Sequence, residues 1–328
     1  MRIRFLSLLC LLFCMSCNED FISEKDTPIG VFNAMWQFID ENYVFIDLKN
    51  LDMEELKNTY SSQLSDSSSD DELFQVCSNL LLDLKDGHCF LDNGNSTVRF
   101  DTGEGFNSLF DLELIKQNYI QGEVIEYEYI TTGNINESTG YIHLSEFENV
   151  DEIRKAITDF NQLGSTIDKI IFDIRNNSGG DPQIALTTAS SFMEREIFLG
   201  QIIHKDGKAH DDFTDPIDIF SEGLPLRFEE DARILTNRNS FSASSYLAGM
   251  LQHRDNVKII GETTGGGGGD VVSYELPNGW VVAVTVNFFL DAMGTHIENG
   301  VEPDISVINT IDNIAVGIDD ILVEAINQ

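Results

Sequence analysis

The feature that most constrains the fold is a short apolar run, KIIFDI, at residues 169–174. Apolar and polar side chains do not alternate in it, so a strand with this sequence needs both faces covered. Comparable runs lie at 232–235 and 257–260, and stretches of helical spacing separate the three. Strands that are buried on both faces and alternate with helices are typical of a parallel sheet covered by helices. We therefore expect an α/β core.

The rest of the chain carries weaker patterns of secondary structure. Apolar residues at helical spacing in three segments of residues 28–85 predict a small N-terminal helical module. The pattern then shifts toward alternation, which predicts strands, with glycines between them. We expect strands at 112–120, 124–129 and 141–144, helices at 150–163, 184–193 and 311–326, and a hairpin over 271–289 that turns at Pro277-Asn278-Gly279.

Four serines, Ser240, Ser242, Ser244 and Ser245, lie at the turn between the strand at 232–235 and a helical pattern at 246–251. A hydroxyl at such a turn is exposed, and a backbone N–H at the helix start lies beside it. That arrangement suits a nucleophile that needs a donor for a developing oxyanion. The alternative is that these serines cap the helix, and the stretch taken alone favours capping.

Glycines mark two further loops. Gly179 and Gly180 follow the strand at 169–174, where their N–H groups can bind an anion or an oxyanion, although a tight turn is an equal alternative. No Gly-Lys-Ser/Thr follows, which excludes a phosphate loop. Five consecutive glycines at 265–269 predict either a mobile loop or close approach of the backbone to a ligand chain. His88 lies just past a predicted helix end, where a histidine can reach a cleft, although the position taken alone favours an ordinary surface histidine.

The net charge of −36 comes from 56 acidic and 20 basic residues. Such a surface repels phosphate backbones, so we expect no nucleic-acid partner and no peripheral binding to anionic lipid. Only Cys77 and Cys89 remain beyond residue 17, and we expect buried thiols rather than the alternative, a disulfide between them.

The N-terminus has the pattern of a targeting segment. Residues 1–4 are basic and residues 5–15 are apolar, a length that suits a signal peptide and is too short to span a bilayer. The segment ends in CMSC at 14–17, which resembles a bacterial lipoprotein cleavage site, and the acidic residues 18–20 resemble a Bacteroidetes-type surface-export signal. We therefore expect removal of residues 1–16, lipidation of Cys17, a tether at 17–27, and a cell-envelope location at the outer membrane or cell surface. Contact with the membrane would be through the lipid anchor only. The alternative is an ordinary secretory signal that is cleaved elsewhere.

Five stretches, in this order, resemble the C-terminal processing, or tail-specific, serine peptidase family. They are DGH at 86–88, FDIRNNSGG at 172–180, SFSAS at 240–244, GETTGG at 261–266 and GVEPD at 300–304. The resemblance implies a spiral core of β-sheets and helices like that of the crotonase and caseinolytic-protease superfamily, of α/β (α+β) class, over residues 86–328.

The same resemblance implies roles for individual residues. Ser242 matches the family nucleophile, and the N–H of Ala243 together with Gly179 or Gly180 matches the oxyanion hole, in agreement with the serine turn and glycine loop. The resemblance implies a serine endopeptidase that acts on peptides or unfolded proteins and needs no cofactor. The alternative is a catalytically silent surface lipoprotein that binds a peptide or another ligand on the same scaffold.

The sequence departs from the better-known branch of that family. The position of that branch's lysine base is Gly267, which excludes a Ser–Lys pair there, and the span 92–139 is too short for a PDZ domain. The lysine-free branch resembles tricorn-type proteases, which implies His88 as the general base. Glu298 matches the supporting glutamate, with Glu302 as the alternative.

Two further features bear on that assignment. Tricorn-type sites have a serine just before the histidine, where this chain has Gly87, so a relay from Glu298 to His88 would need a water or a direct contact. A metal site from His88, His296 and Asp92 is not expected, because neither a His-x-x-x-His motif nor a cysteine pair is present.

Overall fold

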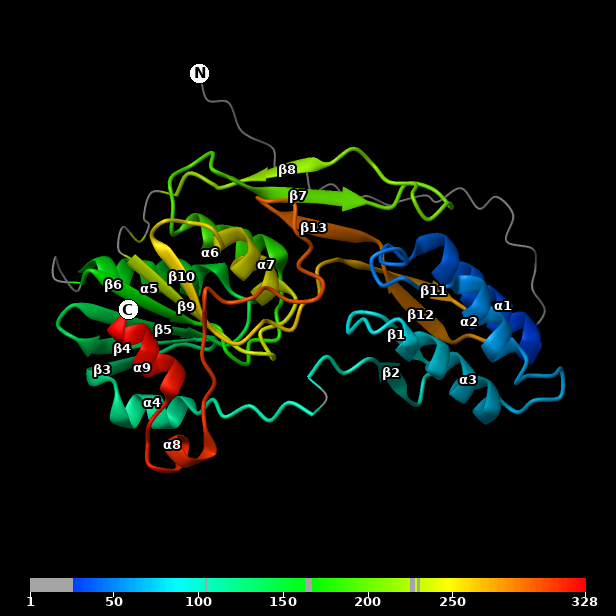
Figure 1. Ribbon diagram of the computed structural model, residues 1–328, viewed down its shortest axis with the longest axis horizontal. Helices are drawn as coiled ribbons and strands as arrows, with labels where there is room; N and C mark the ends of the chain where they lie inside the picture. Colours follow the sequence, from blue (N-terminus) through cyan, green and yellow to red (C-terminus); the bar gives the residue numbers. More distant parts are fainter. Residues whose placement is uncertain (1–25, 104, 163–166, 225–227, 229–230) are drawn as a thin grey trace, which may run out of the picture.

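A computed structural model describes residues 26–103, 105–162, 167–224, 228 and 231–328. The expected signal peptide, the lipidation site at Cys17 and most of the expected tether lie outside these residues. Figure 1 shows a large lobe built on one sheet and a smaller lobe that carries the N-terminal helices.

The large lobe contains a mixed sheet of seven strands within the described ranges, in the order β14-β10-β9-β6-β5-β4-β3. The neighbours from β5 to β14 are parallel, and β3, β4 and β5 pair antiparallel. The strands are β3 (Gln121–Glu126), β4 (Ile130–Asn136), β5 (Thr139–Leu144), β6 (Lys169–Asp173), β9 (Asp231–Thr236), β10 (Val257–Gly261) and β14 (Ile305–Ser306).

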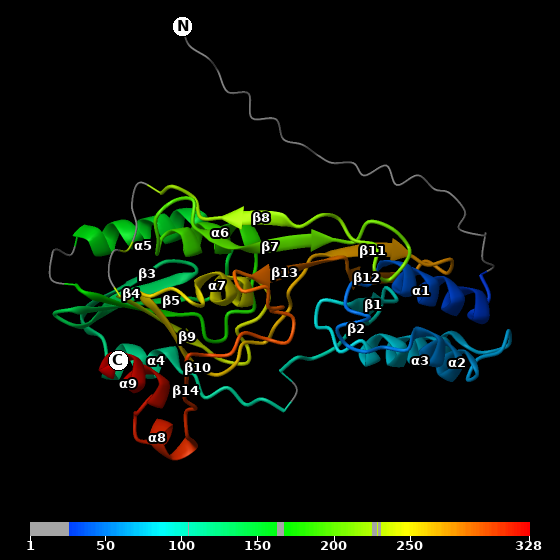
Figure 2. The ribbon, with the colours of Figure 1, turned by 45° about the horizontal axis from the view of Figure 1, so that its top comes forward.

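Helices cover both faces of this sheet (Figure 2). One face carries α5 (Val150–Gln162), α6 (Pro182–Ser190) and α7 (Ala243–Leu251), and the other carries α4 (Leu112–Asn118) and α9 (Asp320–Asn327). In the central strand β6, Ile170 and Phe172 pack toward the first set, while Ile171 packs toward the second. The prediction of an α/β fold with a strand buried on both faces is confirmed.

The small lobe joins helices to a second sheet. Three predicted helices form, α1 (Pro28–Asn42), α2 (Met53–Ser61) and α3 (Asp70–Asp83), and Ser69 and Glu72 make a reciprocal capping box at the start of α3. Their apolar faces share one core with the antiparallel sheet β11-β12-β1-β2. Its strands are β1 (Phe90–Asp92), β2 (Thr97–Arg99), β11 (Val271–Glu275) and β12 (Val281–Thr285).

A third antiparallel sheet, β13-β7-β8, runs along the top of Figure 1 toward both lobes. Its strands are β7 (Phe198–His204), β8 (Ile217–Phe220) and β13 (Asn287–Asp291). The predicted hairpin over 271–289 is therefore correct only for β11 and β12, because the chain leaves that sheet after Thr285 and pairs with β7 instead. Strands β1, β2, β4, β7, β8 and β14 were not predicted.

Two other predictions were wrong. Residues 112–120 were expected as a strand but form helix α4, because the Asp111 side chain caps the helix by accepting from Leu114 N, and Ile115 is its buried residue. The terminal helix expected over 311–326 is two helices, α8 (Ile311–Ala315) and α9, since Gly317 interrupts it with a φ of +86°.

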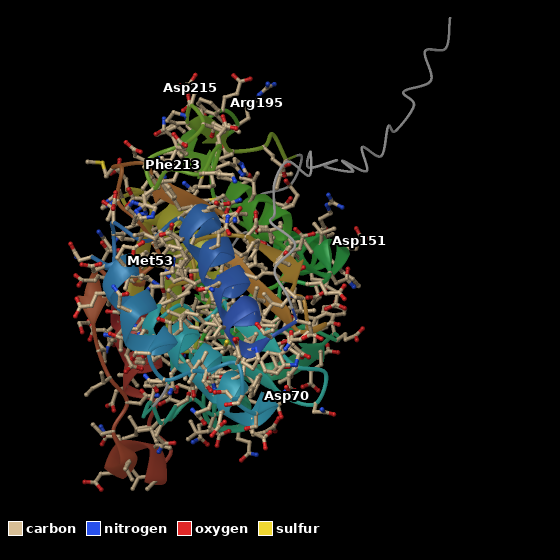
Figure 3. The ribbon with its side chains drawn as sticks, turned by 90° about the vertical axis from the view of Figure 1, so that its right-hand side faces the viewer. Met53, Asp70, Asp151, Arg195, Phe213 and Asp215 are labelled. Carbon is tan, nitrogen blue, oxygen red and sulfur yellow. The ribbon has the colours of Figure 1, made fainter. Side chains whose placement is uncertain are left out.

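Acidic side chains are exposed on the surface, in agreement with the excess of acidic over basic residues in the sequence. Asp70, Asp151 and Asp215 are exposed on different parts of it (Figure 3). Across the described segments, no helix is both long and apolar enough to cross a bilayer. Cys77 and Cys89 are free and buried, as expected.

Candidate active site

Ser242 stands at the start of α7 but does not cap it. Its side chain makes no capping hydrogen bond; instead its Oγ lies 3.0 Å from Nε2 of His88, which is 154 positions away in sequence. Its backbone has φ 56° and ψ −119°, a region that non-glycine residues rarely adopt. Strain of this kind is typical of a serine held at a sharp strand-to-helix turn with its hydroxyl exposed.

The neighbouring serines have structural roles. Ser240 and Ser244 donate to backbone carbonyls at 2.8 and 2.9 Å, and Ser245 pairs with the hydroxyl of Thr264 at 2.8 Å. All three are fully buried. Of the four serines in this turn, Ser242 is therefore the one whose hydroxyl lies next to a base.

His88 occupies the connection between α3 and β1. Its backbone N–H donates to Asp86 Oδ1 at 2.8 Å, and the other oxygen of Asp86 accepts from Thr285 Oγ1 at 2.8 Å. The imidazole packs on Phe241, with ring centroids 4.8 Å apart. A Cβ at Gly87 would lie 2.8 Å from the Thr102 side chain, so packing favours glycine at this position.

The charge state of His88 suits a base. Burial lowers the pKa of His88, and the carboxylates of Asp86 and Asp270 oppose this shift. Nδ1 is buried and has no hydrogen-bond partner among the described residues, so a direct bond from Glu298 to this atom is absent. A neutral ring that accepts at Nε2 carries its proton on Nδ1.

The two loop glycines differ in the use of their amides. Gly179 packs so closely on the nucleophile turn that a Cβ would lie 2.7 Å from Ser242 Cβ and 3.1 Å from Ala243 N. Its N–H, however, donates to Asn177 Oδ1 at 2.8 Å. Within the described part of the chain, the amides of Gly180 and Ala243 have no protein acceptor. Both glycines have φ values above +100°, which other residues strongly disfavour.

The five glycines at 265–269 are buried and pack closely against other parts of the chain. Gly266 O accepts from Ser242 N at 2.9 Å, and Gly267 would place a Cβ 2.8 Å from His88 Cε1. Gly269 lies so close to the Asn287 carbonyl that a Cβ would be 2.0 Å from its oxygen. The close backbone approach predicted for this run is therefore to the chain itself.

Glu298 reaches the site through these glycines. Its Oε2 accepts from Gly268 N at 3.0 Å, and its Oε1 lies 2.6 Å from the ammonium of Lys49. Burial and the nearby Asp86 raise the pKa of Glu298 to about 7, against the lowering effect of Lys49. The alternative, Glu302, is exposed. Sequence reasoning missed Lys49, because its pairing with a residue 249 positions away leaves no local pattern.

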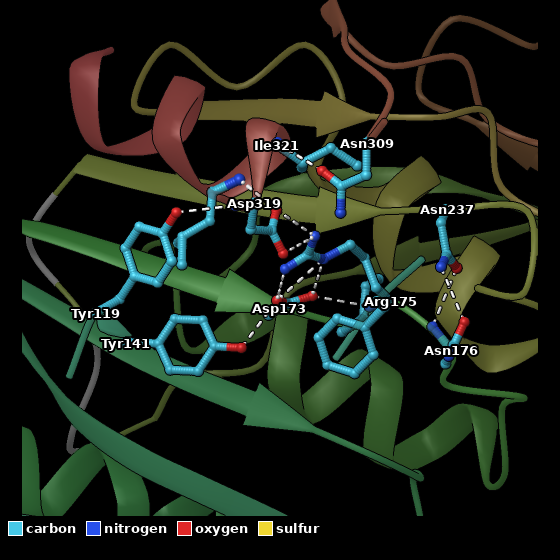
Figure 4. Close-up of polar contacts among 12 residues, drawn as sticks. Tyr119, Tyr141, Asp173, Arg175, Asn176, Asn237, Asn309, Asp319 and Ile321 are labelled. Atoms are coloured by element: carbon cyan, nitrogen blue, oxygen red, sulfur yellow. Dashed lines mark hydrogen bonds and ion pairs between the residues drawn. The ribbon is translucent and has the colours of Figure 1, made fainter. Parts of the chain in front are cut away.

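A buried ion network holds the strand end that leads into the glycine loop (Figure 4). Arg175 contacts Asp173 at 2.6 Å and Asp319 at 2.9 Å, and all three side chains are almost fully buried. Asn176 and Asn237 then tie the loop to the nucleophile turn through two hydrogen bonds of 2.9 and 3.0 Å. The network thus holds the residues from which the chain continues into Gly179 and Gly180.

His88, His296 and Asp92, the candidate ligands of a metal site, do not form a cluster in the structure. The ring of His296 packs on Phe45 and Phe288, and Asp92 bonds to Thr97 and to the amide of Gly94. Where the structure describes the chain, it holds no group of three or more potential metal-ligating side chains.

Comparisons with known proteins identify the family of the chain. The family model for peptidase family S41 matches residues 138–307, and that for the tricorn protease C1 domain matches residues 27–81. The Probable CtpA-like serine protease of Staphylococcus aureus (strain COL) is 28% identical over 196 residues, which are 59% of this chain and 37% of that protein. The carboxyl-terminal-processing protease of Picosynechococcus sp. is 30% identical over 175 residues, or 51% and 39% of the two chains. The chain spans less than two fifths of the length of these relatives.

Solved structures show the same fold. A Parabacteroides merdae protein with a provisional peptidase name superimposes with a TM-score of 0.84 at 29% identity, over 92% of this chain and 96% of that one. The photosystem II D1 C-terminal processing protease, at 20% identity and a TM-score of 0.57, covers 86% and 93% and supports the fold alone. Because the S41 match covers more than half of the chain, the protein belongs to peptidase family S41, a family of serine-type peptidases.

Proposed function

We propose that the protein is a serine endopeptidase that hydrolyses peptide bonds through an acyl-enzyme at Ser242, with His88 as the general base. The observation that carries this proposal is the 3.0 Å contact between His88 Nε2 and Ser242 Oγ. A nucleophile needs an adjacent base within hydrogen-bond reach, and this pair has that spacing.

In the first step, Ser242 Oγ attacks the peptide carbonyl carbon as His88 Nε2 takes its proton. Because burial lowers the pKa of His88, the ring is neutral near pH 7 and can accept that proton. The strained backbone of Ser242 keeps the hydroxyl at the turn, rather than turned back to cap α7.

The tetrahedral oxyanion needs donors that are already in place. The N–H of Ala243 supplies one, since it begins a helix and has no other protein acceptor in the described structure. Gly180 supplies the second, because the N–H of Gly179 is committed to Asn177. Gly179 contributes by lacking a side chain where a Cβ would collide with Ser242.

The intermediate then collapses. The C–N bond breaks, and His88 returns its proton to the leaving amine, which leaves an ester between Ser242 and the acyl half of the substrate. A water molecule enters, His88 takes its proton, and the hydroxide attacks the ester carbonyl. Ser242 leaves with the proton from His88, which restores the enzyme.

The site has room for a peptide. A cavity of about 400 Å³ adjoins it and is lined by Gly87, Arg99, Phe100, Asp101, Thr102 and Phe241. Since Phe241 contacts the His88 ring, a substrate side chain in this cavity would bring its peptide bond toward the pair. Strand β11 lies at one edge of its sheet with Val271 and Val272 exposed, which suits addition of an extended peptide. The glycine run itself is buried and cannot take part in this pairing.

A lipid anchor at Cys17 and a cell-envelope location are part of the proposal, supported by the sequence at 1–20. Metabolic labelling with an alkyne fatty acid checks this point. The full-length protein should become labelled and the Cys17→Ser variant should not; labelling that persists in the variant would contradict lipidation at this residue.

A fluorophosphonate probe tests the nucleophile directly. The protein should be labelled, digestion should locate the label on Ser242, and Ser242→Ala should abolish both labelling and hydrolysis of fluorescein-casein. Ser67→Ala, which alters an exposed loop serine, is the matched control and should behave like the parent. Hydrolysis that survives in Ser242→Ala would move the nucleophile to another residue. No labelling and no hydrolysis in the parent would favour a silent binding protein on this scaffold.

A further inference from the structure

Lys49 lies in the N-terminal lobe, shortly after α1, yet its side chain ends at the active site. Its ammonium contacts Glu298 Oε1 at 2.6 Å and donates to the Lys85 carbonyl at 3.0 Å. Only 10% of the Lys49 side chain and 4% of the Glu298 side chain are exposed. A lysine is rarely this buried unless it is paired, so both contacts need an explanation.

The contact between Lys49 and the Lys85 carbonyl fixes the chain that leads to His88. Lys85 stands three positions before His88 and has a φ of +50°, which is unusual for a lysine. Asp86 then holds the His88 amide and the Thr285 hydroxyl with its two oxygens. Lys49 therefore anchors the start of a short segment whose far end carries the imidazole.

The contact between Lys49 and Glu298 fixes the opposite wall of the site. Glu298 accepts from Gly268 N with its carboxylate and from Gly267 N with its backbone carbonyl, at 3.0 and 3.2 Å. Gly267 packs on the His88 ring, and its neighbour Gly266 accepts from the Ser242 amide. One carboxylate thus holds the glycine run that touches both members of the pair.

We propose that Lys49 is a positioning residue, whose ammonium clamps the Lys85 carbonyl to the Glu298 carboxylate and so sets the distance between His88 and Ser242. The proposal rests on the proposed function, because it takes His88 and Ser242 as the reacting pair. An ammonium bound to a carboxylate is a donor, so Lys49 does not replace the missing family lysine as a base. The N-terminal lobe thereby becomes part of the catalytic site rather than an attached module.

The charge of Lys49 also supports a role for this residue in holding Glu298. Burial and Asp86 both favour the neutral form of Glu298, and Lys49 is the cation that opposes them. Without Lys49, the carboxylate would be an unpaired buried charge or would take up a proton. Uptake of a proton would weaken the hydrogen bond that this carboxylate accepts from Gly268 N.

Three variants of the full chain test the proposal with a fluorophosphonate probe and fluorescein-casein. Lys49→Met should lower the maximal labelling rate of Ser242 and the kcat for casein by tenfold or more, while the probe KI and the KM change less than twofold. Lys57→Met is the matched control, since this lysine of the same lobe lies over the Trp36 ring and away from the site. It should leave both rates unchanged.

The double variant Lys49→Met/Glu298→Gln separates positioning from a purely structural ion pair. It contains no unpaired buried charge, so it should regain thermal stability even if Lys49→Met is poorly folded. The proposal expects kcat to stay at least tenfold low in this stable protein. A double variant with parental stability and parental kcat, or Lys49→Met with parental kcat, would overturn it. Ser242→Ala in the same assay shows which idea failed: if Ser242→Ala retains hydrolysis, the proposed function itself is wrong.

Discussion

Gly267 allows a sharp test of how tightly the site is packed. This residue stands at the position that the family resemblance assigns to a lysine base, and it has a φ of +80°. A Cβ there would lie 2.6 Å from two ring carbons of Phe241 and 2.8 Å from His88 Cε1. Carbon atoms prefer separations of about 3.5 Å or more, so the Gly267→Ala variant must push the imidazole by roughly 0.7 Å.

The expected effect has two separable parts. A non-glycine residue in the left-handed region costs about 1 to 2 kcal/mol of stability, wherever it occurs. Displacement of His88 adds a catalytic loss of about 100-fold, the penalty typical of a 1 Å misplacement of reacting groups. Gly279→Ala isolates the first part, because Gly279 has a φ of +83° and a methyl group added there would meet no atom within 4 Å.

The assay compares the two alanine variants in urea unfolding and in kcat/KM for fluorescein-casein. Gly267→Ala should lose more stability than Gly279→Ala, because its Cβ also crowds Phe241 and His88, and it should lose about 100-fold more activity. Gly267→Lys should be at least as impaired, since it carries the same Cβ. If Gly267→Ala keeps activity within about threefold of Gly279→Ala, the packing argument around His88 is refuted.

Two further predictions concern charge. Burial lowers the pKa of His88, and only the neutral ring accepts a proton, so activity should fall with decreasing pH through a midpoint below the ordinary histidine value of about 6.5. A pH profile of kcat/KM checks this, and an acid midpoint clearly above 6.5 would contradict it. Arg175→Met should lose about 3–5 kcal/mol in urea unfolding because Asp173 and Asp319 become unpaired buried charges. Arg195→Met, at an exposed pair, should change stability by less than about 0.5 kcal/mol, and equal losses in the two variants would argue against the buried network.

The central strands could be predicted because their nearly continuous apolar sequences indicate burial on both faces. The apolar run at 169–174 needs two covered faces, and β6 has them. Helix α4 was mistaken for a strand because seven residues are too few to separate the two periodicities, and its deciding feature is a cap by Asp111. Strand β7 was missed since its partner β13 lies far along the chain.

Some residues of the candidate site also have a local sequence signal, and others have none. Ser242 and the loop glycines sit at strand ends, so local sequence places them at turns. Taken alone, however, the serine stretch favours capping, an ordinary turn is an equal alternative for the glycines, and the family resemblance assigns their roles. The glycine run was ambiguous, because its conformation is set by distant carbonyls such as that of Glu298. Lys49 could not be found at all, because its partners Lys85 and Glu298 come together only in the folded protein.

The most direct test of the account is a double-mutant cycle on the proposed pair, measured as kcat for fluorescein-casein. If His88 serves only to activate Ser242, each of Ser242→Ala and His88→Ala should lose roughly 1,000-fold or more, and the double variant should be no worse than the single ones. Losses that multiply in the double variant, or a His88→Ala variant that keeps a tenth of the parental kcat, would contradict the claim that these two side chains act as one unit.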